Sequence, residues 1–191
     1  MDEIKILNSK IFIYKNYEND FKDVVTPNLI HSDNILEVKD GKEKMDNLDG
    51  IFTSNKEIKI GIKTADCAPV CYFDGEKIGI AHIGWPGLCT ELNKKMLSNF
   101  NTKNLKIFIG PFIHRFEIKK DFCFDKLKGD FSMFMDYEGD KIFFNFKDAL
   151  LSQFKSLNVI IDGRDTFMDL SLPSYRRDKT KDRLLTVISF N

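Results

Sequence analysis

The sequence has no excess charge and no long hydrophobic run, and each absence excludes a class of protein. Its 191 residues include 29 basic and 29 acidic side chains, so no net charge draws it to a nucleic-acid backbone. The longest apolar runs, such as residues 107–109, fall far short of the roughly 20 residues of a membrane-spanning helix. The acidic residues 2–3 are unlike the basic start of an export signal. We therefore expect a soluble, cytoplasmic protein without membrane or nucleic-acid partners.

Cysteine and histidine are also scarce, with four and three copies. The cysteines are Cys67, Cys71, Cys89 and Cys123, and no pair has the CxxC spacing of a structural zinc site. Without an export signal, we expect them to be reduced thiols. The chain also contains no Walker loop and no GxGxxG, HExxH or GxSxG motif. The common signatures of nucleotide binding, zinc proteolysis and serine hydrolysis are therefore missing.

Hydrophobic periodicity predicts many strands and two helices in a single domain of residues 1–191. Apolar runs predict strands at residues 4–14, 57–63, 68–73, 77–82, 105–109, 159–161 and 184–190. Near-helical spacing predicts one helix with Thr90 as its N-cap and apolar residues Leu88, Leu92, Met96 and Phe100. A second helix is predicted from Phe146, Leu150, Phe154 and Leu157. Residues 15–56 are expected to form loops and short strands, and the mixture is typical of mixed α/β or α+β layers.

A predicted hairpin brings a thiol close to an imidazole. Asp74 and Gly75 suit a two-residue turn, and in that register Cys67 lies directly opposite His82. Their Cβ atoms would be roughly 4.5–5.5 Å apart. At that distance a thiolate and an imidazole can share a proton or bind one metal ion.

The same hairpin leaves an alternative open. Pro69 would lie opposite Ile80, and proline cannot donate to the ladder, which favours an edge strand or a bulge. A slip of one residue would place Cys67 and His82 on opposite faces of the sheet. The pair would then be a small buried thiol and a hydrogen-bonded core histidine.

Arginine is concentrated near the C-terminus. Arg176 and Arg177 are two of only five arginines, and Arg183 follows closely. The planar guanidinium group suits phosphate or carboxylate, although a solvated basic turn is the alternative. His31 and His114 have no evident partner in the sequence, and we interpret both as structural or surface residues.

The ordered motifs resemble one known family. It is the multicopper polyphenol oxidase (laccase)-domain family, whose members are also called purine nucleoside phosphorylase/adenosine deaminase and peptidoglycan editing factor. The segments that carry the resemblance are LDGIFT at 48–53, TADCAPV at 64–70, HIGWPG at 82–87, IGP at 109–111 and SYRRD at 174–178. The resemblance runs from about residue 36 to the C-terminus, and the chain is identified as a diverged member with a short N-terminal region.

The resemblance implies a fold and a metal. The fold is one of mixed β-sheets sandwiched between helices, in α-β-β-α layers. The metal is usually zinc, held by His, Cys and His, and the motifs assign Cys67 and His82 as two of its ligands. The family's first histidine, in Q-V-H-G, corresponds to Lys39 within residues 37–41. Because an ammonium group cannot coordinate zinc, a substitute third ligand would be needed.

We expect that substitute to be His31, His114 or a carboxylate such as Asp40. Three other departures concern the site. Pro86 replaces the family's arginine in G-W-R-G, residues 109–118 lack the family's cysteines, and Asp165–Thr166 replaces a C-T pair.

Three functions follow as hypotheses. The first is metal-assisted purine nucleoside phosphorolysis and adenosine deamination, acting on adenosine and inosine, with zinc at the catalytic residues Cys67 and His82 and phosphate held by Arg176 and Arg177. The second is a metal-free Cys–His hydrolase in peptidoglycan precursor editing. The third is a diverged, non-catalytic binding protein. Copper-dependent phenol oxidation is excluded, because three histidines cannot build a multicopper site.

Overall fold

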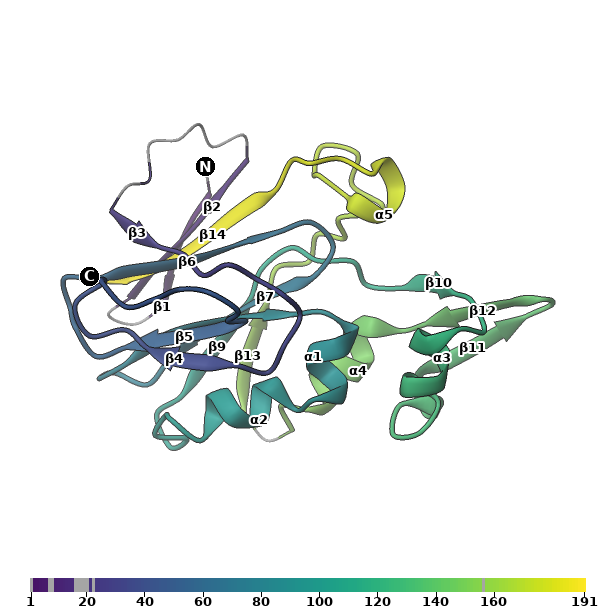
Figure 1. Ribbon diagram of the computed structural model, residues 1–191, viewed down its shortest axis with the longest axis horizontal. Helices are drawn as coiled ribbons and strands as arrows, with labels where there is room; N and C mark the ends of the chain where they lie inside the picture. Colours follow the sequence, from purple (N-terminus) through teal and green to yellow (C-terminus); the bar gives the residue numbers. More distant parts are fainter. Residues whose placement is uncertain (1, 7–8, 16–20, 22, 156) are drawn as a thin grey trace.

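Two stacked β-sheets with helices on one side form the body of the molecule (Figure 1). The computed structural model describes residues 2–6, 9–15, 21, 23–155 and 157–191. The five-stranded sheet has the order β1-β2-β14-β6-β3. Its strands are β1 (Asp2–Ile6), β2 (Ser9–Tyr14), β3 (Val24–Val25), β6 (Lys59–Thr64) and β14 (Leu184–Phe190). The predicted strands at 57–63 and 184–190 correspond to β6 and β14, and the described part of the predicted 4–14 segment forms β1 and β2. Residues 7 and 8 of that segment lie outside the described residues.

The six-stranded sheet has the order β13-β9-β7-β8-β5-β4. Its strands are β4 (Ile35–Glu37), β5 (Gly50–Thr53), β7 (Ala68–Phe73), β8 (Ile78–Ile83), β9 (Lys106–Ile109) and β13 (Asn158–Ile161). Every residue of β7 and β8 is buried. Both faces of these central strands are covered, which explains their nearly continuous apolar sequences.

The first core lies between the two sheets. Alternate residues of β2 and β6 face inward, and they meet β7 and β8 of the opposite sheet. The buried residues of this core include Ile11, Ile13, Ile60, Ile62, Cys71, Phe73, Ile78, Ile80, Phe108 and Ile188. The alternation of apolar and polar residues along β2 and β6 thus indicates which face of the five-stranded sheet is covered.

Helices cover the other face of the six-stranded sheet (Figure 1). They are α1 (Trp85–Cys89), α2 (Leu92–Leu97) and α4 (Phe146–Ser152). The prediction of one helix capped by Thr90 is wrong, because Thr90 ends α1 and its hydroxyl donates to the Pro86 carbonyl. Glu91 then takes a left-handed conformation (φ 55°) that breaks the helix in two. The break lets Leu88 and Leu92 both pack into this core.

A small three-stranded sheet extends from one end of the molecule. It consists of β10 (Phe116–Ile118), β11 (Met135–Glu138) and β12 (Lys141–Phe144), together with α3 (Phe122–Leu127) and the 3-10 helix η1 (Ser132–Phe134). The sequence patterns missed these elements, because the strands have only three or four residues. The short helix α5 (Tyr175–Asp178) precedes β14. The predicted mixed α and β fold is confirmed, but the implied α-β-β-α layering is not, because in the described residues the helices that pack on a sheet, α1, α2 and α4, all cover the six-stranded sheet. No helix in the described residues is long and apolar enough to cross a membrane.

Candidate metal centre and substrate cavity

Three side chains from separate segments meet at one end of the β7–β8 hairpin. We call them the His–Cys–His cluster: His31, Cys67 and His82. Their potential ligand atoms all lie within 4.8 Å of one another. His31 Nε2 is 3.7 Å from Cys67 Sγ, and the two imidazole rings have centroids 4.7 Å apart. The sequence predicted the closeness of Cys67 and His82, and the structure brings them together.

The predicted register of the hairpin is nevertheless wrong by two residues. His82 pairs with Pro69, and Ala68 pairs with Ile83. The turn is longer than two residues because the Asp74 carboxylate accepts hydrogen bonds from the amides of residues 76 and 77. A shift of two preserves the face, so Cys67 now lies beside Gly84. A Cβ atom on Gly84 would be only 3.0 Å from Cys67 Sγ, and a glycine here leaves room for the thiol.

The third member of the cluster is His31, and the assignment of Lys39 to that position is wrong. Lys39 is exposed beyond β4, where its amide donates to Glu43. His31 was one of three proposed substitutes, and it alone lies in the cluster among the described residues. His114 instead contacts Asp165. One sequence feature could have identified His31. In the run Leu-Ile-His-Ser at 29–32 the histidine is followed by a small residue, as it is in the family's Q-V-H-G.

The cluster fits a metal ion such as zinc. Two imidazole nitrogens and a thiolate are preferred zinc ligands, and tetrahedral bonds of about 2.0–2.3 Å place neighbouring ligand atoms roughly 3.3–3.7 Å apart. The observed separations reach this range with small side-chain adjustments. Three protein ligands leave a fourth position for water or substrate, which is typical of catalytic rather than structural zinc.

A buried carboxylate holds both histidines. Asp49, directly before β5, is fully buried. His82 Nδ1 donates to its Oδ1 at 2.8 Å, which leaves Nε2 of that ring facing the cluster. The amide of His31 donates to the same oxygen at 3.0 Å, and the amide and hydroxyl of Ser32 donate to Oδ2. These contacts hold His31 in its left-handed conformation (φ 61°).

The cluster also activates its thiol. Burial alone raises the pKa of Cys67, but the charge of His82 and the hydrogen bond with His31 outweigh burial and lower the pKa to about 6. Burial lowers the pKa of His82, yet the Cys67 thiolate and Asp49 together raise it. The pKa of Asp49 falls to about 2 because hydrogen bonds from His82 and Ser32 overcome its burial. The thiolate needed for metal binding is therefore available at neutral pH.

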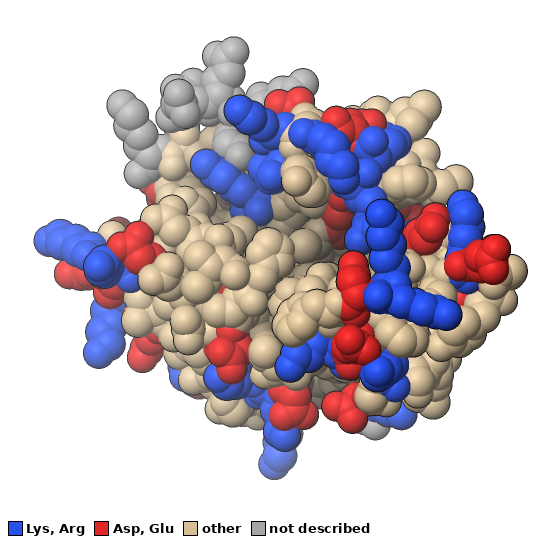
Figure 2. Space-filling model, turned by 45° about the vertical axis from the view of Figure 1, so that its right-hand side comes forward, with Lys and Arg blue, Asp and Glu red and all other residues tan. Residues whose placement is uncertain are grey.

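The cluster lines a cavity of about 620 Å³, a size typical of small-molecule sites. Its cationic lining residues are Lys63, Arg176 and Arg183. Its aromatic lining residues are Trp85, Phe116, Phe146 and Tyr175. Figure 2, in which the right-hand side of Figure 1 is turned toward the reader, shows a hollow in this face of the molecule. Lys and Arg side chains lie along part of the border of the hollow. The lining suits a ligand with an aromatic ring and an anionic group.

A second buried carboxylate fixes the segment that contributes Arg176. Asp66 has a left-handed conformation (φ 84°). Its Oδ1 accepts from the Thr166 hydroxyl at 2.9 Å, and its Oδ2 accepts from the Arg176 amide at 2.6 Å. The Arg176 guanidinium lies 4.4 Å from the centre of the Phe116 ring. Asp66 thus docks the first turn of α5 against the cavity.

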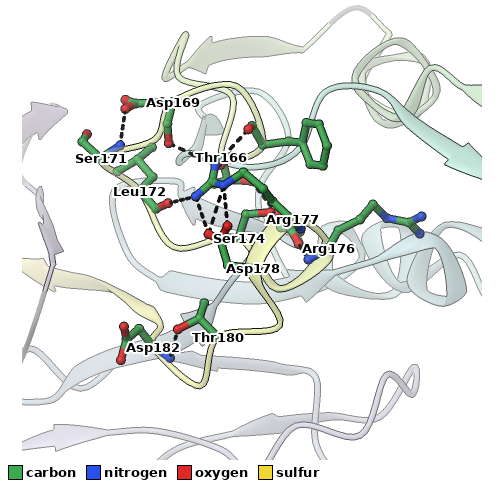
Figure 3. Close-up of polar contacts among 12 residues, drawn as sticks. Thr166, Asp169, Ser171, Leu172, Ser174, Arg176, Arg177, Asp178, Thr180 and Asp182 are labelled. Carbon is green, nitrogen blue, oxygen red and sulfur yellow. Dashed lines mark hydrogen bonds and ion pairs between the residues drawn. The ribbon is translucent and has the colours of Figure 1, made fainter.

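Arg177, by contrast, points into its own loop (Figure 3). Its guanidinium donates to the carbonyls of Thr166, Phe167 and Leu172 and to the Asp178 carboxylate. These contacts occupy the N–H donors of the Arg177 guanidinium group. Arg177 is also not among the cavity-lining residues of the described chain. Of the two adjacent arginines, the structure therefore places Arg176, and not Arg177, on the lining of the cavity. Arg183 and Lys63 were not singled out as site residues from the sequence.

Comparison with known proteins shows the family of this chain. The model of the family described as multi-copper polyphenol oxidoreductase laccase matches residues 5–191. The chain belongs to this family. A purine nucleoside phosphorylase of Aquifex aeolicus is 26% identical over 190 residues, which cover 95% of this chain and 89% of that protein. A purine nucleoside phosphorylase of Borreliella burgdorferi is 31% identical over 168 residues, covering 78% and 71%.

The fold is shared with a solved structure at low sequence identity. A Neisseria meningitidis protein superposes with a TM-score of 0.82 at 18% identity, over 97% of this chain and 96% of that one. In this laccase-like family member, the His–Cys–His cluster is complete despite the differences at Pro86 and residues 109–118. The arrangement can hold one metal ion beside an aromatic and cationic cavity, or it can present a thiolate nucleophile next to an imidazolium.

Proposed function

We propose that the protein is a zinc-dependent purine nucleoside phosphorylase that also deaminates adenosine. The observation that supports it most strongly is the His–Cys–His cluster on the wall of a cavity with three cations and four aromatic rings. Two relatives that align over most of this chain are named purine nucleoside phosphorylases. Adenosine and inosine are the proposed substrates.

The residues of the cavity have three proposed roles: metal binding, purine binding and phosphate binding. His31, Cys67 and His82 would hold the ion, which when bound supplies a Lewis acid for polarising the substrate or activating water. Aromatic side chains, Trp85 and Tyr175 among them, offer faces for the purine ring.

The cations would bind the co-substrate. In phosphorolysis a phosphate oxygen forms a bond to the ribose C1′ as the purine nitrogen leaves with the bonding electrons. Arg176, Lys63 and Arg183 line the cavity, and their charges would hold the phosphate for this attack. Arg176 is the anchor that both sequence and geometry favour.

The test is product analysis of zinc-loaded protein incubated with inosine or adenosine, with and without phosphate. We expect hypoxanthine and ribose 1-phosphate from inosine only when phosphate is present, and inosine from adenosine without it. Cys67→Ala should abolish both reactions. Cys89→Ala is the matched control, since Cys89 is a half-buried thiol of α1 outside the cavity lining. No product from the intact, zinc-loaded protein would refute the proposal.

A metal-free thiol hydrolase is the second candidate. The hydrogen bond between Asp49 and His82 continues toward Cys67 in the order of a Cys–His–Asp triad. Such a site would cleave an amide or ester, as in a peptidoglycan precursor. Chelator treatment distinguishes the two functions, because it would stop nucleoside turnover but leave hydrolysis of a simple ester such as p-nitrophenyl acetate intact. If neither substrate is turned over, a binding role is the remaining hypothesis.

A further inference from the structure

Two buried aspartates adjoin the His–Cys–His cluster, and the groups that they bind are chemically different. We propose that each aspartate positions a different part of this site. Asp49 holds both histidines in place for the metal, and Asp66 holds α5 in place so that Arg176 faces the cavity. Neither carboxylate is a ligand or a catalytic residue in this scheme. The inference rests on the proposed function in one respect, since it assigns the Arg176 side to phosphate.

Asp49 is surrounded by hydrogen-bond donors. Oδ1 accepts from the His31 amide and from His82 Nδ1, at 3.0 and 2.8 Å. Oδ2 accepts from the amides of Ile30 and Ser32, at 3.3 and 2.6 Å. Backbone amides can only donate, and His82 Nδ1 must donate when Nε2 binds a metal. The two histidines are therefore held by one group that has to accept on both oxygens.

An asparagine cannot take over this task. Whichever way its side-chain amide is turned, the NH2 group of Asp49→Asn would face at least one backbone amide. If the NH2 group faced His82, it would favour the tautomer that is protonated on Nε2, and this tautomer cannot bind the metal. The substitution should therefore weaken metal binding although it changes the shape of the side chain very little.

Asp66 has different partners. It accepts from the Thr166 hydroxyl and from the Arg176 amide, and a hydroxyl can also accept. The asparagine of Asp66→Asn can accept from the Arg176 amide through its oxygen and donate to Thr166 through its nitrogen. Asparagine also tolerates the left-handed backbone (φ 84°) found at this position. Asp66→Asn should therefore preserve the docking of α5, whereas Asp66→Ala removes both hydrogen bonds.

The first measurement is Co²⁺ binding, followed by the visible absorption of cobalt bound to thiolate and by competition with Zn²⁺. We expect Asp49→Asn to bind metal about 10–100-fold more weakly than the unmodified protein. Asp66→Ala and Asp66→Asn should bind it as tightly as the unmodified protein. Because Asp66 directly precedes Cys67, a loss of cobalt affinity in Asp66→Ala would contradict the division of roles. Full affinity in Asp49→Asn would contradict it as well.

The second measurement separates KM from kcat. Asp66→Ala should raise the KM for phosphate about tenfold, the effect of losing hydrogen bonds to a charged group, with a smaller change in kcat. Asp66→Asn should restore the KM. Failure of this rescue would show that the negative charge, and not the docking of α5, is what matters at Asp66.

A third measurement is independent of turnover. Amide hydrogen exchange in peptides that cover residues 174–178 should accelerate in Asp66→Ala and stay unchanged in Asp66→Asn and Asp49→Asn. If no nucleoside is turned over but cobalt binding and exchange behave as expected, the proposed function is refuted and the positioning roles stand. If exchange at 174–178 is unchanged in Asp66→Ala, the role of Asp66 is refuted whatever the substrate.

Discussion

At the scale of single residues, Cys67 differs from the other cysteines through its neighbours. Cys71 lies in the core between the sheets, where burial raises the pKa of its thiol far above the ordinary value. Burial likewise raises the pKa of Cys89, and it raises the pKa of Cys123 to about 11. Only at Cys67 do adjacent imidazoles reverse the effect. We therefore expect Cys67 to be reactive and the other three thiols to be inert.

The alkylation of Cys67 should follow this difference. In chelator-treated protein, iodoacetamide should label Cys67 selectively at pH 7, as measured by peptide mass spectrometry. The thiolate is the reactive form, so with a pKa of about 6 the labelling rate is near its maximum above pH 7 and falls as the pH drops below 6.

Two variants check the cause. His82→Ala removes the cation that stabilises the thiolate, and it should move the midpoint of labelling upward toward the ordinary thiol pKa. Cys123→Ala is the control and should leave the midpoint unchanged. A midpoint for Cys67 near that of a free thiol in the unmodified protein would contradict the geometry of the cluster.

At the scale of elements, α5 shows how neighbouring residues on one short helix acquire separate tasks. Ser174 caps the helix by accepting from the Arg177 amide, and Asp66 binds the Arg176 amide. Figure 3 shows the two arginine side chains pointing in different directions. Arg177 binds the carbonyls of the loop at 166–172, while Arg176 reaches the cavity.

Substitution of these two arginines should therefore have different consequences. Arg177→Gln leaves several carbonyls without a donor, at a cost of about 2 kcal/mol, and should lower Tm by roughly 4–8 °C for a domain of this size. Arg176→Gln should change Tm less and raise the KM for phosphate. Thermal denaturation and steady-state kinetics measure the two effects. Equal Tm losses, or an Arg177→Gln enzyme that loses only phosphate affinity, would show that the roles are misassigned.

At the scale of the whole molecule, the cluster connects segments that are far apart in the chain. His31 and Cys67 are 36 residues apart, and Asp49 and His82 are 33 apart. His31 precedes β4 at one edge of the six-stranded sheet, and Cys67 precedes β7 near its centre. A metal ion bound here would tie these segments together in the folded state only.

Metal binding should accordingly stabilise the fold. Zinc at a hundred-fold excess over its Kd adds about 2.7 kcal/mol to the free energy of unfolding, or roughly 5–11 °C in Tm for a domain of this size. Differential scanning calorimetry with and without zinc measures the shift. Cys67→Ala should lose it, and Cys89→Ala should keep it. An equal rise in Tm for both variants would place the zinc elsewhere on the protein.

The sequence by itself determined the elements whose signal is local. Alternation predicted β6 and β14, and the apolar run at 105–109 predicted β9, because a half-buried strand repeats every two residues. The ordered motifs determined the family, and the hairpin placed Cys67 and His82 on one face. The placement on one face is correct although the predicted register is wrong, because a shift of two residues leaves each side chain on the same face of the hairpin.

Only the tertiary structure decided which groups complete the site. His31 becomes the third member of the cluster through its hydrogen bonds to Asp49, and no periodicity links residues so far apart in the chain. Arg176 and Arg177 are identical in type and adjacent in sequence, so their tasks depend on the direction in which α5 is docked by Asp66. The length of the 74–77 turn likewise depends on where the Asp74 carboxylate finds its donors. Local patterns record which face is buried, whereas the meeting of distant side chains depends on sheet pairing and buried hydrogen bonds.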